Sequence, residues 1–136
     1  IDANAISICQ NYYNNNKNTK KIDNIQWINA NFLDTTYNTM DDDEVVVVLG
    51  GPPYTSGAGS GAEIERNLPN QFVRHCISTY DAIYIAFILP VRYRNTSILP
   101  SDKNNWKTKT HEITSNFYFQ GKRKVIQPSI IQELYE

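Results

Sequence analysis

Five consecutive aliphatic residues, VVVVL at positions 45–49, are followed at once by a Gly-Gly-Pro-Pro turn. A β-branched run of this kind is typical of a strand that is buried on both faces at the centre of a parallel sheet. The turn ends the strand, because proline has no backbone N–H to give to a sheet ladder. This strand with its abrupt end is the strongest constraint on the fold, and it indicates an α/β protein.

A helix and a second apolar strand follow the first strand. Pro69 suits the first turn of a helix, and apolar residues recur at helical spacing from Phe72 to Tyr80. Residues 82–89 (AIYIAFIL) are predicted to be a second buried strand. The order strand, helix, strand predicts a right-handed crossover between two parallel strands.

The rest of the chain gives weaker signals. Residues 111–119 alternate, residues 128–135 are predicted to be a final strand, and the short connection between them favours antiparallel pairing. Other expected elements are a short helix, a polar loop, a short strand and an irregular basic segment, at residues 5–9, 11–21, 22–28 and 91–110. The sequence thus predicts a single domain, residues 1–136, with a three-layer α/β fold. Its sheet is expected to be mostly parallel, with a C-terminal antiparallel hairpin.

Composition excludes several classes of protein. The chain has 136 residues, of which 40% are hydrophobic, which is enough for one domain with a core. Two cysteines, Cys9 and Cys76, make no disulfide framework, and the absence of a CxxC or His/Cys cluster predicts that there is no metal site. No apolar run approaches the roughly 20 residues that span a bilayer, and no signal peptide is visible. We therefore expect an intracellular protein, in the cytoplasm or nucleus, without a membrane partner.

The charges are unevenly distributed. Residues 1–89 carry five basic and ten acidic side chains, whereas residues 90–136 carry eight basic and four acidic ones. Such asymmetry can mark a polyanion-binding face, and the alternative is an ordinary solvated surface. The residues predicted to meet nucleic-acid phosphates are Arg92, Arg94, Lys122, Arg123 and Lys124.

Three segments are predicted to lie at one edge of the sheet, where ligands bind in open α/β folds. They are residues 1–2, 31–32 and 51–54. An acid at this edge can bind a ribose hydroxyl pair, and an asparagine can hydrogen-bond an adenine amino group. The Pro-Pro-Tyr turn is rigid and presents an aromatic face that can hold a flat ring.

These residues carry a resemblance to a known family. The segment VVVVLGGPPYTSG resembles motif IV of the class I S-adenosylmethionine-dependent methyltransferases, in the amino-methylating branch with Asn/Asp-Pro-Pro-Tyr/Phe. The segments AFILPVRYRNTSI and FYFQGKRKVIQPSIIQELYE are similar to the next strand and the closing hairpin of that branch's small nucleic-acid enzymes. The resemblance implies a Rossmann-like sheet, S-adenosylmethionine as cofactor, and methyl transfer to an amino nitrogen of a base in DNA or RNA, with adenine N6 as the expected target.

The resemblance also implies roles for individual residues. Pro52, Pro53 and Tyr54 correspond to the catalytic turn, with Tyr54 as a stacking platform for the base; the alternative is a tyrosine at the edge of the core. The implied cofactor-binding residues are Asp2, Asn31, Phe32 and Gly50. For Asp2 the alternative is a helix cap, and for Asn31 it is a turn asparagine.

Two departures from the family pattern keep other hypotheses open. The family's first strand and Gly-rich cofactor loop would precede Ile1, so this chain is expected to lack them. Gly51 stands where Asn or Asp accepts a hydrogen bond from the target amino group, which glycine cannot do. Gly-Gly-Pro-Pro is also similar to cytosine-C5 methyltransferases, but Tyr54 replaces their nucleophilic cysteine.

Two further hypotheses therefore stand beside the enzyme. One is a catalytically degenerate methyltransferase-like module that binds nucleic acid or a protein partner. The other is a different nucleotide-binding α/β protein, which no Gly-rich phosphate motif supports.

Overall fold

The computed structural model describes residues 3–16, 24–37, 43–53, 68–113, 118–120 and 126–136. The chain divides into two compact units, Ile1–Thr35 and Thr36–Glu136. The first unit contains a helix and a 3-10 turn, and the second contains a sheet with a helix beside it.

In the first unit, helix α1 spans Ala3–Asn15 and the 3-10 helix η1 spans Phe32–Asp34. Residues 11–15, predicted to be a loop, continue the helix, because asparagine in a helix costs only a few tenths of a kcal/mol relative to better helix formers, by order of magnitude. Residues 24–29 are irregular, so the short strand predicted there is wrong for these residues. An alternating pattern forms no stable strand without neighbouring strands to pair with.

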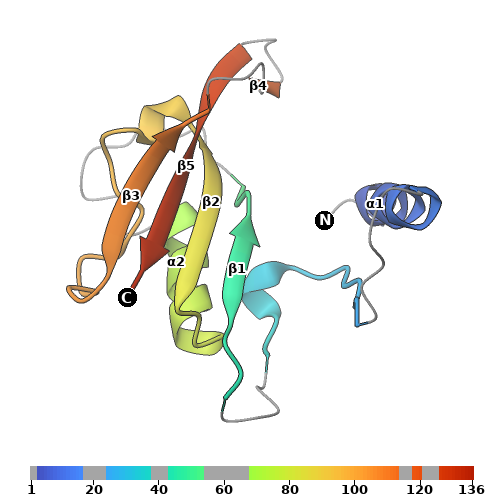
Figure 1. Ribbon diagram of the computed structural model, residues 1–136, viewed down its shortest axis with the longest axis horizontal. Coiled ribbons are helices and arrows are strands. Elements are labelled where there is room, and N and C mark those ends of the chain that lie inside the picture. Colours follow the sequence, from blue (N-terminus) through green and yellow to red (C-terminus); the bar gives the residue numbers. More distant parts are fainter. Residues whose placement is uncertain (1–2, 17–23, 38–42, 54–67, 114–117, 121–125) are drawn as a thin grey trace. The chain divides into compact units, whose positions relative to one another are not determined.

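The second unit is built on a twisted sheet (Figure 1). Its strands are β1 (Val47–Gly50), β2 (Tyr84–Pro90), β3 (Lys107–Glu112), β4 (Tyr118–Gln120) and β5 (Ile126–Tyr135). The strand order is β1-β2-β5-β3, and β4 also pairs with β5. β1 and β2 are parallel, which confirms the predicted crossover, whereas β5 pairs antiparallel with β2, β3 and β4.

Helix α2 (Leu68–Thr79) connects the two parallel strands and lies along one face of the sheet (Figure 1). Pro69 occupies its first turn, where a missing N–H sacrifices no hydrogen bond. Beyond its other end, the Ala82 N–H donates to the Cys76 carbonyl at 3.1 Å, and Asp81 has a φ of 50°. Asp81 therefore has the left-handed conformation that usually belongs to glycine just beyond a helix end.

The core lies between α2 and alternate residues of β2 and β5. The alternately buried residues of these strands are Ile85, Phe87, Leu89, Ile130, Gln132 and Leu134, and the register pair Pro90 and Ser129 is buried as well. Their register places Ile85 opposite Leu134 and Leu89 opposite Ile130, and α2 adds the fully buried Val73. Because burial alternates along most of β2 and β5, the sheet is covered by side-chain packing mainly on one face.

The predicted three-layer, mostly parallel, Rossmann-like sheet is therefore wrong. Among the described strands, one pair is parallel and three are antiparallel, and α2 is the only described α-helix of the second unit. β1 is also not buried on both faces, since Val45, Val47 and Leu49 are 62%, 52% and 71% exposed. β1 lies at the sheet edge with one described neighbour, and these side chains point away from the face that packs against α2.

The C-terminal strands are close to the prediction. β5 begins two residues before the predicted start. The partner strand predicted at residues 111–119 is divided: residues 111–112 end β3 and residues 118–119 belong to β4, and both strands pair antiparallel with β5. β3 lies at Lys107–Glu112, mostly within the segment predicted to be irregular, because this exposed strand alternates threonine with lysine and carries no apolar pattern. Neither described helix is long and apolar enough to cross a lipid bilayer.

Candidate functional site at the carboxyl edge of the parallel strands

Two turns leave the sheet at the same edge. β1 and β2 are parallel, so the turn Gly51-Pro52-Pro53 and the 3-10 helix η3 (Val91–Tyr93) both follow the carboxyl ends of strands that run in the same direction (Figure 1). β1 ends at Gly50, opposite Phe87, and β2 continues for three more residues to Pro90. In α/β folds this is the edge at which ligands bind. The structure thus brings two of the predicted segments, the Pro-Pro turn and the basic segment after β2, to one edge of the sheet.

The turn after β1 combines a buried anchor with an open backbone. Pro52 is buried, whereas Gly51 and Pro53 are exposed. A Cβ added at Gly50 would meet no atom within 4 Å, and neither Gly50 nor Gly51 has a positive φ. A ligand can therefore approach this backbone closely, and an ordinary side chain at position 51 would not be strained by its φ.

Buried amides fix the chain that follows β2. Gln132 donates from Nε2 to the carbonyls of Tyr93 and Thr96 at 2.8 and 2.9 Å, and its Oε1 accepts from the Ile98 N–H at 3.2 Å. The Asn70 side chain donates to the Ile98 carbonyl at 2.9 Å. Gln132 and Asn70 are 1% and 3% exposed, so these contacts form in a desolvated setting.

The two arginines of this segment have different surroundings. The exposed Arg92 places its guanidinium 5.3 Å from the centre of the Tyr93 ring, within the range of a cation–π interaction. Arg94 instead forms an ion pair with Glu112 of β3, with 3.0 Å between Nη2 and Oε1. The sequence predicts the same phosphate-binding role for both arginines, whereas in the structure they have different neighbours.

Two of the predicted cofactor-binding residues lie in the first unit and are described there by themselves. Asn31 and Phe32 belong to the first unit, where the Asn31 amide donates to Asp34 at 2.8 Å and Phe32 accepts from the Thr35 hydroxyl at 2.6 Å. These are the contacts of a local turn. Five predicted residues lie outside the described part of the chain: Asp2, Tyr54, Lys122, Arg123 and Lys124.

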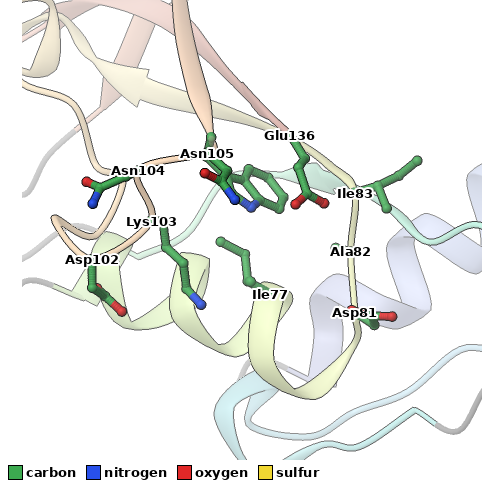
Figure 2. A pocket seen from close by; sticks show the side chains of 10 residues that line it. Ile77, Asp81, Ala82, Ile83, Asp102, Lys103, Asn104, Asn105 and Glu136 are labelled. Carbon is green, nitrogen blue, oxygen red and sulfur yellow. The ribbon is translucent and has the colours of Figure 1, made fainter.

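A pocket of about 410 Å³ lies at the opposite edge of the sheet, where β2 begins and β5 ends (Figure 2). Its lining is mostly polar and includes Asp81, Asp102, Lys103, Trp106 and Glu136. A hydrogen bond from the backbone N–H of Asp102 is the main cause that lowers its pKa, and Arg74, 3.0 Å away, adds to the effect. Sequence reasoning did not single out this pocket, because its residues come from segments without a recognisable motif.

Cys76 and His75, although adjacent in the sequence, do not form a reactive dyad. Burial raises the pKa of Cys76 to about 12, so its thiol is protonated at neutral pH. His75 lies 3.2 Å from the Thr79 hydroxyl and meets the edge of the Tyr80 ring, which is the setting of a structural histidine. The described residues also contain no group of three or more His, Cys, Asp or Glu that could hold a metal ion.

Comparison with known proteins finds no matching family, no matching curated protein and no matching solved structure.

Proposed function

We propose that this chain takes part in S-adenosylmethionine-dependent methyl transfer to an amino nitrogen of a nucleic-acid base, with adenine N6 as the target. The observation that supports this most is the Pro-Pro turn directly after β1, at the sheet edge that also carries Arg92. The sequence of this turn resembles the catalytic motif of the amino-methylating enzymes. The parallel pairing of β1 with β2 gives it the surroundings that a ligand-binding turn requires.

The chain's contribution is binding and orientation. Pro52, buried at the start of the turn, and Pro53 restrict the backbone, so that the groups facing a bound base are held in place. Gly50 has open space around it and suits close approach of a cofactor to the backbone. S-adenosylmethionine, when bound, supplies an electrophilic methyl group. Holding a base nitrogen in line with that group gives rate through proximity and orientation.

A binding module without catalysis is the second candidate. Gly51 favours it, since the residue at this position has no side chain to accept a hydrogen bond from the target amino group. Such a module would keep the base-binding turn and the basic segment and bind nucleic acid without modifying it.

Calorimetry and a transfer assay separate the two candidates. The chain is titrated with S-adenosylmethionine and S-adenosylhomocysteine, and methyl transfer from labelled cofactor to adenine-containing oligonucleotides is measured. We expect cofactor binding, and methyl transfer that Tyr54→Ala lowers because base binding is weakened by about 1–3 kcal/mol. Oligonucleotide binding without cofactor binding or transfer would reject the enzyme and support the binding module. If Tyr54→Ala leaves methyl transfer unchanged, the Pro-Pro turn is not part of the active site.

A further inference from the structure

The segment from Pro90 to Ile98 is held more firmly than an ordinary surface loop. Gln132 and Asn70 fix it from the core through the carbonyls of Tyr93, Thr96 and Ile98. From the surface, the Ser97 hydroxyl lies 2.8 Å from that of Thr108 on β3, and Arg94 is paired with Glu112. The backbone of this basic segment is therefore fixed before any ligand arrives.

A fixed backbone matters for a charged contact. A loop that orders only on binding loses conformational entropy at that moment, whereas a preformed loop does not. Arg92 is exposed, and its guanidinium lies over the Tyr93 ring, whose carbonyl is bonded to Gln132. Arg94 has a carboxylate 3.0 Å away, which competes with any phosphate and repels it.

We propose that residues 90–98 are a preformed phosphate-binding platform for the nucleic acid of the proposed function, on which this inference rests. Arg92 makes the phosphate contact, and Gln132 is the residue that positions the platform. Arg94 contributes less to phosphate binding, because the Glu112 carboxylate lies 3.0 Å from its guanidinium.

The first test measures how binding depends on salt. Fluorescein-labelled oligo(dA) is titrated with the protein at several salt concentrations, and log K is plotted against log salt. Each phosphate contact to a single strand adds about 0.7 to the slope. Arg92→Gln should reduce the slope by about that amount, and Arg94→Gln should change it far less.

A variant that removes the carboxylate paired with Arg94 gives a sharper test, because a second ion pair of the chain provides a matched control. Glu112→Gln removes the partner of Arg94, and Asp102→Asn removes that of Arg74; both pairs are exposed and are 3.0 Å long. The two variants change the net charge equally, but Asp102 lies at the opposite edge of the sheet. Glu112→Gln should raise the affinity and the salt slope, and Asp102→Asn should leave the slope unchanged.

The positioning role of Gln132 is tested against a core variant that leaves its hydrogen bonds in place. Gln132→Met and Leu134→Ala both remove buried groups of β5, and the thermal midpoint of each is measured with its affinity for oligo(dA). At temperatures where both variants are folded, Gln132→Met should weaken binding by about two- to tenfold, because the freed loop must be ordered on binding. Leu134→Ala should bind as the wild type does.

The outcomes distinguish this inference from the proposed function. Equal responses to Glu112→Gln and Asp102→Asn, or an unchanged slope in Arg92→Gln, would overturn the platform even if methyl transfer is observed. Salt-dependent binding with the expected slopes, but without methyl transfer, would keep the platform and reject the enzyme. A wild-type chain that fails to bind oligo(dA) or oligo(A) at low salt would overturn both the platform and the nucleic-acid partner.

Discussion

At the scale of single residues, Gly51 decides between the enzyme and the binding module. Its φ is not positive, so asparagine can replace it without left-handed strain. The new carboxamide oxygen would accept a hydrogen bond from an amino group held at the turn. We expect Gly51→Asn to raise methyl transfer by roughly ten- to a hundredfold, since a hydrogen bond to a group that develops charge contributes about 1.5–3 kcal/mol. The measurement is transfer from labelled cofactor to adenine oligonucleotides.

Pro53, two positions after Gly51, provides a control for the Gly51 result. Pro53→Ala leaves position 51 unchanged but loosens the turn, and it should lower transfer without adding an acceptor. Thermal unfolding of Gly51→Asn should match that of the wild type within about 0.5 kcal/mol, as for other exposed positions. A folded Gly51→Asn variant with no gain in transfer would contradict the role assigned to this position.

The buried thiol of Cys76 makes the free energy of unfolding fall at high pH. Burial raises the pKa of its thiol from 9.0 to about 12, so the folded state holds the proton more tightly than the unfolded state does. Its contribution to stability is present below pH 9 and is lost as the pH rises toward 12. The free energy of unfolding of the wild type should therefore fall more steeply above pH 9 than that of Cys76→Ala, by at most about 1.4 kcal/mol per pH unit. Parallel denaturant titrations of the two proteins, with identical slopes, would count against burial as the cause.

At the scale of elements, the end of α2 stores a small strain. Asp81 adopts φ of 50° in a position that favours glycine. Asp81→Gly should raise the free energy of unfolding by about 0.5–1 kcal/mol, because glycine enters this conformation without steric cost. Asp81→Ala is the matched control, since it removes the same carboxylate but keeps the Cβ, and it should give no gain. Urea denaturation checks both; equal stabilities for the two variants would show that the backbone conformation is not the source of the effect.

The sequence predicts elements better than it predicts their surroundings. The crossover from β1 through α2 to β2 follows from local signals: a β-branched run, a proline at a helix start, and apolar residues at helical spacing. β3 gives no such signal, since its threonines and lysines form an exposed strand whose pairing with β5 is a long-range property. The lack of long-range information also explains why β1 was wrongly predicted to be buried on both faces. An apolar run shows that a strand is favourable but not how many strands and helices surround it.

The candidate site, too, was predictable from the sequence only where local patterns define it. The Pro-Pro turn and the basic residues after β2 are visible as short patterns, and the crossover that brings them to one edge was predictable. The buried Gln132 was not, because a glutamine in a strand pattern signals an exposed position unless its partners are known. Those partners, Tyr93, Thr96 and Ile98, come from a segment more than thirty positions away. The different surroundings of Arg92 and Arg94 likewise depend on β3.

At the scale of the whole molecule, the exposed edge of β1 makes self-association the expected behaviour at high concentration. β1 pairs with β2 alone among the described strands, and Val47 at its start is 52% exposed. An exposed apolar edge strand can pair with a strand of another chain, and β1 carries no charged side chain that would oppose this. Val47→Lys should suppress association and change the free energy of unfolding by no more than about 1 kcal/mol. Val48→Lys is the control: Val48 pairs with the buried Ile85, so a lysine there should destabilise the fold. Sedimentation velocity over a range of concentrations, together with urea denaturation, measures both effects. A wild-type chain that stays monomeric at every concentration, or a Val47→Lys variant that associates as before, would show that β1 is not the edge responsible.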